Sequence, residues 1–338
     1  MPWSLSRTAR MPLSSPRWAI ALLTCLALCG CVAPLPASGD NTRSQHGAED
    51  QFEGTALQLA IAAEHGQTET IRRLIREDKV DPDTIFAREA GMPLVAWPVY
   101  TRNPEGLKAL LENGADPNAR RPEFVDEKFK DGSGGRRMLH NNALVYAAQA
   151  ENPIYLRLLL AQGGDPNTRN TNDEPLTFVA FIKQNQWQNV KLLVEYGAEV
   201  NSPTIFPGSP LSWYAGRGGF EQVYWLMQHG ADPTKKITGT VAASTDANGT
   251  PLPQEHIPEK GFAWVKYGED GKPVYVDAMP IVENIYWHPG SPATQEWQRL
   301  CQHWLRDKGI KRPPMPESMR KMRKAFEFPL EEKDIPLL

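Results

Sequence analysis

Five stretches of the chain repeat one order of apolar and polar positions. In each, a first block of Leu, Val and Ala is followed by a polar step and then by a second block with two large aliphatic residues side by side. Apolar residues at helical spacing, separated by polar breaks, predict two short helices per stretch. The stretches run over 57–78, 92–114, 142–163, 174–197 and 209–230.

A Gly-containing turn follows the second block of most stretches. It reads GADPN at 114–118, GGDPN at 163–167, GAEVN at 197–201 and GADP at 230–233, with a blurred copy, DKVDPD, at 78–83. Gly supplies the left-handed residue that ends a helix, and Asp before Pro shapes a turn.

The spacing of these turns gives the size of the unit. Gly114 and Gly163 lie 49 residues apart, Gly163 and Gly197 34, and Gly197 and Gly230 33. Such a period is typical of a helix-pair repeat. One pair cannot bury its own apolar face, so the pairs are expected to stack. The predicted fold class is therefore an all-α repeat solenoid.

These residues resemble the ankyrin repeat family, whose pattern is T-P-L-H-x-A-A, a Gly, a Leu-Leu helix and then G-A-D-x-N. The resemblance covers about residues 55–234, and we place five ankyrin-like repeats at 52–234. The family His is absent here, which implies repeats less stable than the consensus. Its places are taken by Val95, Val145, Thr177 and Ser212.

The other segments depart from the repeat. Residues 119–139 are Gly-rich and charged, which predicts an extended loop or finger inserted between repeats. Within 235–278, a loop is followed by alternating residues around GEDGK, typical of a β-hairpin finger. Residues 279–312 are interpreted as a degenerate sixth repeat and 313–338 as a C-terminal cap or tail. The basic run Arg320–Lys324 is either a solvated face or a patch for phosphate or lipid headgroups.

The N-terminus has the pattern of a targeting segment. Arg7, Arg10 and Arg17 precede an apolar stretch at 18–30, which is too short to span a bilayer but suits a secretory signal. It ends in LCGC at 28–31, which resembles the lipobox of bacterial lipoproteins and implies cleavage after residue 30 and lipidation of Cys31. A plain signal peptide cut nearby is the alternative.

Val32, rather than Asp, after that Cys favours the outer membrane, facing the periplasm. Residues 32–51 are Pro-, Ser- and Gly-rich, which predicts a flexible tether. The start of translation is either Met1 or Met11.

Composition narrows the function classes. The net charge of −3 indicates neither a nucleic-acid partner nor a charged membrane surface, so contact with the membrane is expected through the lipid anchor only. After cleavage Cys301 would be the one other Cys, so a disulfide framework is not expected. No His pair has metal-ligand spacing, and no phosphate-binding loop is present, so we expect no metal, no cofactor and no catalytic residues. Glu64 and His65 could form an acid–base pair, but polar residues are routine at a helix end.

The resemblance implies a concave surface on which first helices and finger turns contact a protein partner. Large apolar residues at such positions are candidate hot spots. The alternative is that the inserts fold back and cover them. The expected partner-binding residues are Glu64, His65, Tyr100, Phe181, Ile182, Phe206, Arg217, Tyr275, Tyr286 and Trp287.

These features together predict a non-enzymatic, protein-binding lipoprotein of the bacterial envelope that is a monomer when free. The preferred role is an immunity protein that neutralises a secreted antibacterial effector by stoichiometric binding. The alternatives are an envelope scaffold or assembly factor with an endogenous partner, and an enzyme that uses residues 235–338.

Overall fold

The computed structural model describes most of the chain beyond residue 46. The chain divides into the units Met1–Arg43 and Ser44–Leu338, and every described residue belongs to the second. The signal segment, Cys31 and most of the tether therefore lie outside the described residues, as does Phe206. Only the backbone is described for the strands and for Pro280. The described residues are 47–85, 92–120, 124–128, 134–138, 141–183, 186–202, 208–235, 264–267, 273–276, 280–331 and 335.

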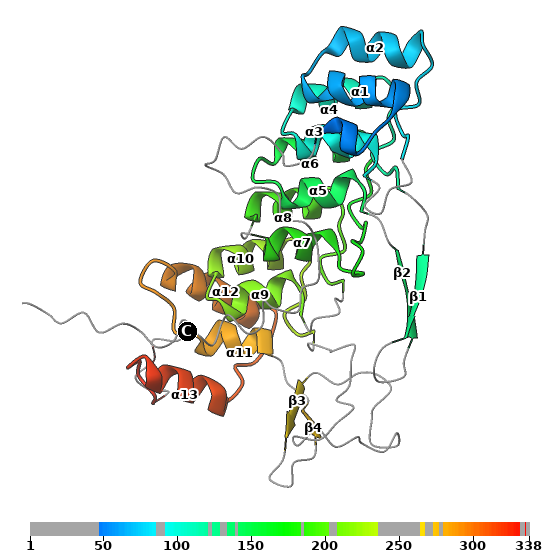
Figure 1. Ribbon diagram of the computed structural model, residues 1–338. Coiled ribbons are helices and arrows are strands. Elements are labelled where there is room, and N and C mark those ends of the chain that lie inside the picture. Colours follow the sequence, from blue (N-terminus) through cyan, green and yellow to red (C-terminus); the bar gives the residue numbers. More distant parts are fainter. Residues whose placement is uncertain are drawn as a thin grey trace, which may run out of the picture. The chain divides into compact units, whose positions relative to one another are not determined.

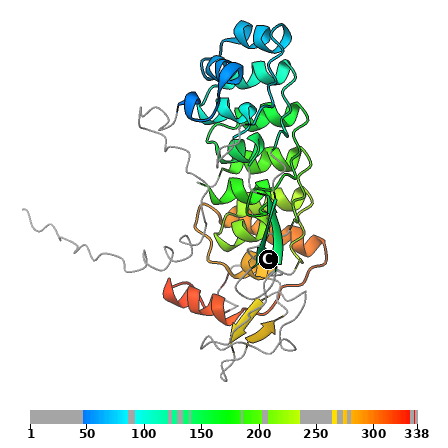
Figure 2. The same ribbon diagram turned by 45° about the vertical axis from the view of Figure 1, so that its right-hand side comes forward.

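Helices alternate between two layers as the chain advances (Figures 1 and 2). Each first-layer helix packs against the second-layer helix that follows it and against the next first-layer helix. The result is a stack of helix pairs, as the sequence predicts. The first layer holds α1 (Gly54–Glu64), α3 (Trp97–Tyr100), α5 (Ala143–Gln149), α7 (Leu176–Ile182), α9 (Pro210–Gly216) and α11 (Pro280–Trp287). The second holds α2 (Thr68–Arg76), α4 (Pro104–Glu112), α6 (Ile154–Ala161), α8 (Trp187–Glu195), α10 (Phe220–Gln228) and α12 (Gln295–Asp307).

Two 3₁₀ turns accompany the helices at the start of the stack, η2 (Ala48–Asp50) and η3 (Leu94–Ala96). The second runs directly into α3, the shortest first-layer helix. Pro98 lies in that helix and has no N–H to donate to the preceding turn, so a long regular helix is not formed here.

Helices this short are marginal in water by themselves, so packing between them must supply their stability. The core lies between the layers and between successive pairs. The aliphatic pairs singled out in the sequence are buried there, apart from the partly buried Ile75. Fully buried Leu residues recur along the stack at Leu59, Leu107, Leu110, Leu144, Leu156, Leu159, Leu176, Leu193, Leu211 and Leu226.

The helix-ending glycines adopt the predicted left-handed conformation. Their φ angles are 104° at Gly114, 87° at Gly163, 94° at Gly197 and 89° at Gly230. Residues with a Cβ rarely adopt such values, which explains why Gly recurs at this step. Ser209 caps α9, because its hydroxyl accepts a hydrogen bond from the Ser212 N–H at 3.4 Å.

An Asn at the end of three of the turns joins one repeat to the next. Asn118 Nδ2 donates to Gly163 O at 3.1 Å, and its Oδ1 accepts from the Asp165 N–H at 2.8 Å. Asn167 makes the same pair of bonds to Gly197 O, at 3.4 Å, and to the Glu199 N–H, at 2.8 Å. We call this series the inter-repeat ladder.

The ladder extends in both directions from these two steps. Asn201 bonds Gly230 O and the Asp232 N–H, both at 3.0 Å. At the other end Asp83 Oδ1 accepts from the Asp116 N–H at 2.8 Å. The ladder thus follows the described turns from the first repeat to the fifth.

The Asp of each DPN turn fixes the Asn that forms the ladder. Asp116 Oδ1 accepts from the Asn118 N–H at 2.8 Å, and Asp165 Oδ1 accepts from the Asn167 N–H at 2.9 Å. These side-chain-to-backbone bonds two residues along are Asx turns. The recurring tripeptide therefore does more than redirect the chain, because it also bonds the next repeat.

Among the described residues, two antiparallel strand pairs accompany the helices. The segment 119–139, expected to be an extended loop or finger, contains β1 (Phe124–Lys128) and β2 (Gly134–Met138), paired from Phe124–Met138 to Lys128–Gly134. Further along, β3 (Trp264–Tyr267) pairs with β4 (Pro273–Val276) from Trp264–Val276 to Tyr267–Pro273. The expected turn GEDGK lies outside the described residues.

The stack continues past residue 235 into α11 and α12, which pack on α9 and α10 respectively. Cys301 of α12 is buried, and its Sγ lies 3.4 Å from Phe220 O at the start of α10. After α12 comes a final helix, α13 (Glu317–Ala325). Within the described part of the chain, every helix is too short or too polar to cross a membrane.

The ladder predicts a stability effect for an exposed side chain. Asn167→Ala removes both of its bonds to the next repeat and should lower the free energy of unfolding by about 1–2 kcal/mol. Asn167→Asp keeps the acceptor for the Glu199 N–H and should lose about half as much. Urea unfolding followed by circular dichroism measures both.

The matched control is Arg157→Ala, because Arg157 is an exposed residue of α6. This substitution should change stability by less than about 0.5 kcal/mol. Equal stability of Asn167→Ala and wild type would show that the ladder contributes nothing measurable.

Candidate partner-binding surface

The expected partner-binding residues gather at the ends of first-layer helices. Phe206 lies outside the described residues, and only the backbone of Tyr275 is described. The other eight fall into three separate groups, at the end of α1 and α3, at the end of α7 and α9, and at the end of α11. Their side chains differ widely in exposure, so each group is considered in turn.

The first group surrounds Trp97, which is fully buried. Its Nε1 donates to Glu64 Oε2 at 3.3 Å, and Tyr100 stacks on its ring at 5.4 Å with an interplanar angle of 28°. Glu64 and Tyr100 remain half-buried and His65 is exposed. Glu64 is thus used as a hydrogen-bond acceptor for a core indole, which leaves it poorly placed as a catalytic partner of His65.

The end of α1 is fixed by Asn103, which the sequence analysis did not single out. Asn103 Oδ1 accepts from the Gly106 N–H at 2.9 Å and caps α4, while its Nδ2 donates to Glu64 O at 3.0 Å. The helices approach so closely that a Cβ on Gly106 would lie 1.8 Å from Ala63 O. Only Gly fits here, and the first group is therefore held rigidly.

A second Asn performs the same task for α5. Asn189 is 1 % exposed, and its Nδ2 donates to Ala148 O at 3.1 Å and to Ala150 O at 2.8 Å. These carbonyls have no partner further along their own helix, so Asn189 satisfies part of the end of α5. The sequence feature that could have identified Asn189 is a polar residue at a position of α8 where the repeat pattern is apolar.

The second group is centred on Phe181, which is 4 % exposed. Its ring stacks on Trp213 at 5.0 Å and meets Tyr214 edge-on at 5.1 Å. The Arg217 guanidinium lies over the same ring, 4.3 Å from its centre, and Arg217 is exposed. The neighbouring Ile182 is 39 % exposed, which is unusual for so large an aliphatic residue among those described.

Phe181 was expected at the surface, and its burial corrects that expectation. The reason is the pair Trp213–Tyr214 on the next first-layer helix, which covers the ring. Trp187 and Trp225 extend the cluster into the second layer, with ring centres 5.4 Å apart. Of this group, Ile182 and Arg217 are the residues that offer surface to a partner.

The third group is closed off by the C-terminal segment. Tyr286 is 4 % exposed and Trp287 is fully buried, whereas the sequence analysis expected both to be accessible. Trp287 Nε1 donates to Pro313 O at 3.0 Å, and the Arg312 guanidinium lies 5.0 Å from the ring centre. Residues after α12 therefore occupy the place where a partner would have contacted these aromatics.

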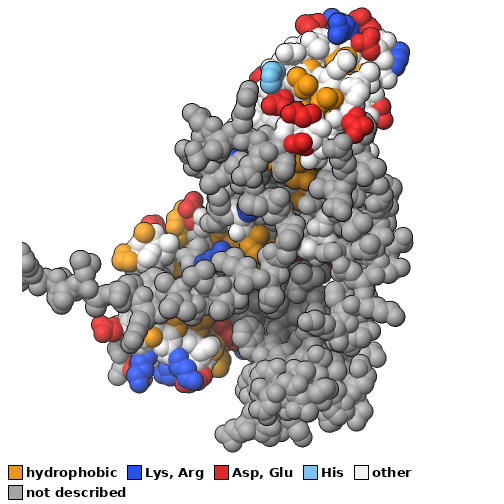
Figure 3. Space-filling model, viewed as in Figure 1, with side chains coloured by type: hydrophobic (Ala, Val, Ile, Leu, Met, Phe, Trp, Pro, Cys, Tyr) orange, Lys and Arg blue, Asp and Glu red, His pale blue; other side chains and the backbone are white. Residues whose placement is uncertain are grey.

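The basic run of α13 divides between two environments. Arg323 is 4 % exposed, and its Nη1 donates to Trp287 O at 3.0 Å. Lys321 and Lys324 are exposed and Arg320 is half-buried. Lysine and arginine side chains accordingly gather over α13 at the lower left of Figure 3. The run is thus not uniformly a solvated face, because Arg323 holds the C-terminal segment against α11.

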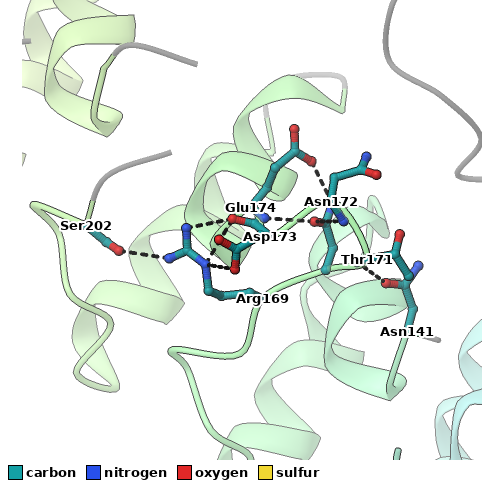
Figure 4. A network of polar contacts seen from close by, with 8 residues as sticks. Asn141, Arg169, Thr171, Asn172, Asp173, Glu174 and Ser202 are labelled. Carbon is teal, nitrogen blue, oxygen red and sulfur yellow. Dashed lines mark hydrogen bonds and ion pairs between the residues drawn. The ribbon is translucent and has the colours of Figure 1, made fainter. Parts of the chain in front are cut away.

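A polar turn before α7 positions the helix that carries Ile182 (Figure 4). Arg169 Nε donates to Asp173 Oδ1 at 2.7 Å, and its Nη1 donates to Ser202 Oγ at 3.2 Å. Asn170 Nδ2 donates to Glu174 Oε2 at 2.6 Å. Glu174 is 4 % exposed, and burial raises the pKa of its carboxyl, opposed by the bond from Asn170 and by the charge of Arg169.

Among the described residues, no group of three or more His, Cys, Asp or Glu side chains is arranged to hold a metal ion. What the first two groups offer is a stacked aromatic framework with a few exposed side chains on it. That arrangement suits recognition by contact.

The raised pKa of Glu174 predicts a pH-dependent stability. Because the folded state holds this proton more tightly than the unfolded state, its contribution to stability is complete below the unfolded pKa and declines as pH rises through the folded pKa. Glu174→Gln keeps an acceptor for Asn170 and removes the charge. The variant should lose less stability than wild type between about pH 4 and pH 7.

Urea unfolding at several pH values checks this, with the exposed Glu195→Gln as the control that leaves the slope unchanged. At pH 7 Glu174→Gln should be at least as stable as wild type. A variant that is less stable there and keeps the wild-type slope contradicts the assignment.

Comparison with solved structures finds similar chains, whereas comparison with known sequences finds none. No family model matches the chain, and no curated protein matches it in sequence. Among solved structures, the chain is similar to the crystal structure of the ankyrin repeat domain of Bcl-3, described as a unique member of the IkappaB protein family. The TM-score is 0.42 at 24% identity, over 55% of this chain and 76% of that one. The helix-pair stack itself rests on the packing described above.

Proposed function

We propose that this chain is a non-enzymatic protein-binding repeat protein that captures its partner through the ends of the first-layer helices. The observation that carries the proposal is the exposed pair Ile182 and Arg217 on the aromatic cluster around Phe181. An exposed aliphatic residue beside a guanidinium that is already held over a ring offers apolar area and directed hydrogen-bond donors together.

Pre-organisation supports this choice of site. The Arg217 guanidinium lies 4.3 Å from the centre of the Phe181 ring. That ring is itself fixed, because it stacks on Trp213 and meets Tyr214 edge-on. A side chain already held in place has less conformational freedom to lose on binding, and more of the contact energy appears as affinity. Glu64, His65 and Tyr100 lie at the equivalent ends of α1 and α3 and form a second, separate contact group in this proposal.

The envelope location is a separate proposal that rests on the leader. The basic residues, the apolar stretch and LCGC at 28–31 support lipidation of Cys31 and attachment to the outer membrane, facing the periplasm. A partner-binding stack on a flexible tether at that site suits the neutralisation of a secreted antibacterial effector, and immunity is the role we propose.

A negative charge introduced at the candidate surface should weaken capture. The full chain is used to recover a partner from periplasmic and outer-membrane extracts, and Ile182→Glu and Arg217→Glu should each weaken binding at least about tenfold. Surface plasmon resonance with the recovered partner measures the change. For the immunity role, that partner should be a secreted toxin whose activity falls to zero at equimolar chain.

The matched control is Tyr196→Glu, because Tyr196 is 43 % exposed, much like Ile182, but follows the second-layer helix α8. Its affinity should equal that of wild type. Loss of binding in Tyr196→Glu with retention in Ile182→Glu would move the surface to the second layer. Recovery of an endogenous envelope complex, with no toxin, would contradict immunity.

Lipidation has its own test. Cys31→Ser should abolish incorporation of labelled palmitate and release the chain from the membrane fraction, because the thiol that carries the lipid is gone. Cys301→Ser is the control, since that thiol is buried. Membrane-bound, palmitate-labelled Cys31→Ser protein would contradict the anchor.

A further inference from the structure

A cavity of about 170 Å³ lies at the C-terminal end of the stack, away from Ile182 and Arg217. It is lined by the end of α11, by α12 and by α13 with the segment that follows. Gln295, Arg299 and Pro329 line it and are also exposed, so the cavity opens to solvent. Its other walls include Tyr286, His288, Gln298, Gln302 and Arg323.

A buried cation forms one wall. Arg323 Nε donates to Pro329 O at 2.7 Å and its Nη1 donates to Trp287 O at 3.0 Å, but among the described residues no carboxylate pairs with it. Buried charges in proteins are generally paired, because an uncompensated charge is costly to remove from water. Consistently, burial lowers the pKa of this guanidinium.

A buried acceptor without a donor forms another wall. Gln302 is 2 % exposed, and its Nε2 donates to Ile285 O at 3.2 Å, but its Oε1 has no hydrogen-bond partner. Gln298 Nε2 already donates to Ile285 O and His288 O, both at 3.0 Å. Ile285 O and His288 O are therefore satisfied, and the side-chain carbonyl of Gln302 is left to accept a hydrogen bond from another group.

The charge and the size of the cavity restrict what could bind. The Arg323 guanidinium has no carboxylate partner among the described residues, so an anion is the ligand that it would bind. Its planar arrangement of N–H donors matches a carboxylate. The Gln302 side-chain carbonyl would accept a hydrogen bond from an N–H or O–H group on the same ligand. A volume of about 170 Å³ lies below the range of about 300–1,000 Å³ typical of pockets for drug-sized ligands, which excludes a nucleotide.

We propose that this cavity binds a small carboxylate whose neighbouring atom carries an N–H or O–H donor, with Arg323 pairing the carboxylate and Gln302 Oε1 accepting from the donor. Two sources have this chemistry, a free hydroxy acid and the C-terminal residue of a polypeptide. Arg299 at the exposed edge supplies a second positive charge along the path of entry. The proposal is independent of partner binding at Ile182.

Isothermal titration calorimetry on the full chain tests the cavity with defined probes. Lactate represents the free hydroxy acid and N-acetylglycine represents a chain terminus. At least one should bind with a dissociation constant of about 1 mM or below. Lactamide and N-acetylglycinamide, which lack the charge, should not bind, and propionate, which lacks the donor, should bind at least about tenfold more weakly. If lactate binds and N-acetylglycine does not, the ligand is a free hydroxy acid. If only N-acetylglycine binds, the ligand is the C-terminal residue of a polypeptide.

Variants separate the two contacts. Gln302→Met removes Oε1 at similar volume and should abolish the preference for lactate or N-acetylglycine over propionate. Arg323→Gln should abolish carboxylate binding, and thermal unfolding shows whether the variant folds. Because Arg323 also holds the C-terminal segment, Gln302→Met keeps the proposal testable if Arg323→Gln unfolds.

Two controls complete the design. Lys324→Gln, on the exposed side of α13, should leave the dissociation constant unchanged, and so should Ile182→Glu, so that this proposal and the proposed function fail separately. No carboxylate binding up to about 10 mM, equal binding by the uncharged amides, or an unchanged preference in Gln302→Met would overturn the proposal.

Discussion

The side-chain hydrogen bonds of the inter-repeat ladder set the geometry on which the rest of this structure depends. Asn118, Asn167 and Asn201 each bond a carbonyl and an N–H of the next turn, so successive helix pairs are held in one register. Short helices have little stability of their own, and a stack of them needs every pair to present its apolar face to the next. The ladder fixes that alignment at one edge of each repeat, while buried Leu residues stabilise the centre.

A second set of polar contacts fixes the opposite ends of the first-layer helices. Asn103 and Asn189 each donate from a second-layer helix to the last carbonyls of the first-layer helix of the preceding repeat. Such groups would otherwise lack partners in a buried place. Because the ends of α1 and α5 are tied in this way, the residues that follow them have defined positions. At the proposed partner surface, Arg217 is held instead by the Phe181 ring, which stacks on Trp213, and a side chain already held in place loses less entropy on binding.

The middle of the stack and its last repeat bury their aromatic residues in different ways. In the middle, the aromatic residues of one repeat are covered by those of the next, as Phe181 is by Trp213 and Tyr214. The last repeat has no successor, and the C-terminal segment covers Tyr286 and Trp287 instead, through Pro313, Arg312 and Arg323. Placing a guanidinium in that cover brings a charge into the interior, and no carboxylate of the described residues pairs with it. The cavity at this end and its proposed anionic ligand are a consequence of closing the stack in this way.

The sequence by itself determined the repeats, because each depends on residues close together in the chain. The aliphatic pairs and the left-handed Gly residues are local features, and both appear where the sequence predicts them. The ladder was not foreseen, since Asn118 and its partner Gly163 are separated by the insert, although the Asn recurs visibly in the turns at 114–118, 163–167 and 197–201. Only the tertiary structure decided which aromatic residues reach solvent. Trp287 and Phe181 occupy positions that look accessible in a repeat taken alone, but each is covered by side chains tens of residues away, and contacts over such distances leave no periodic signal.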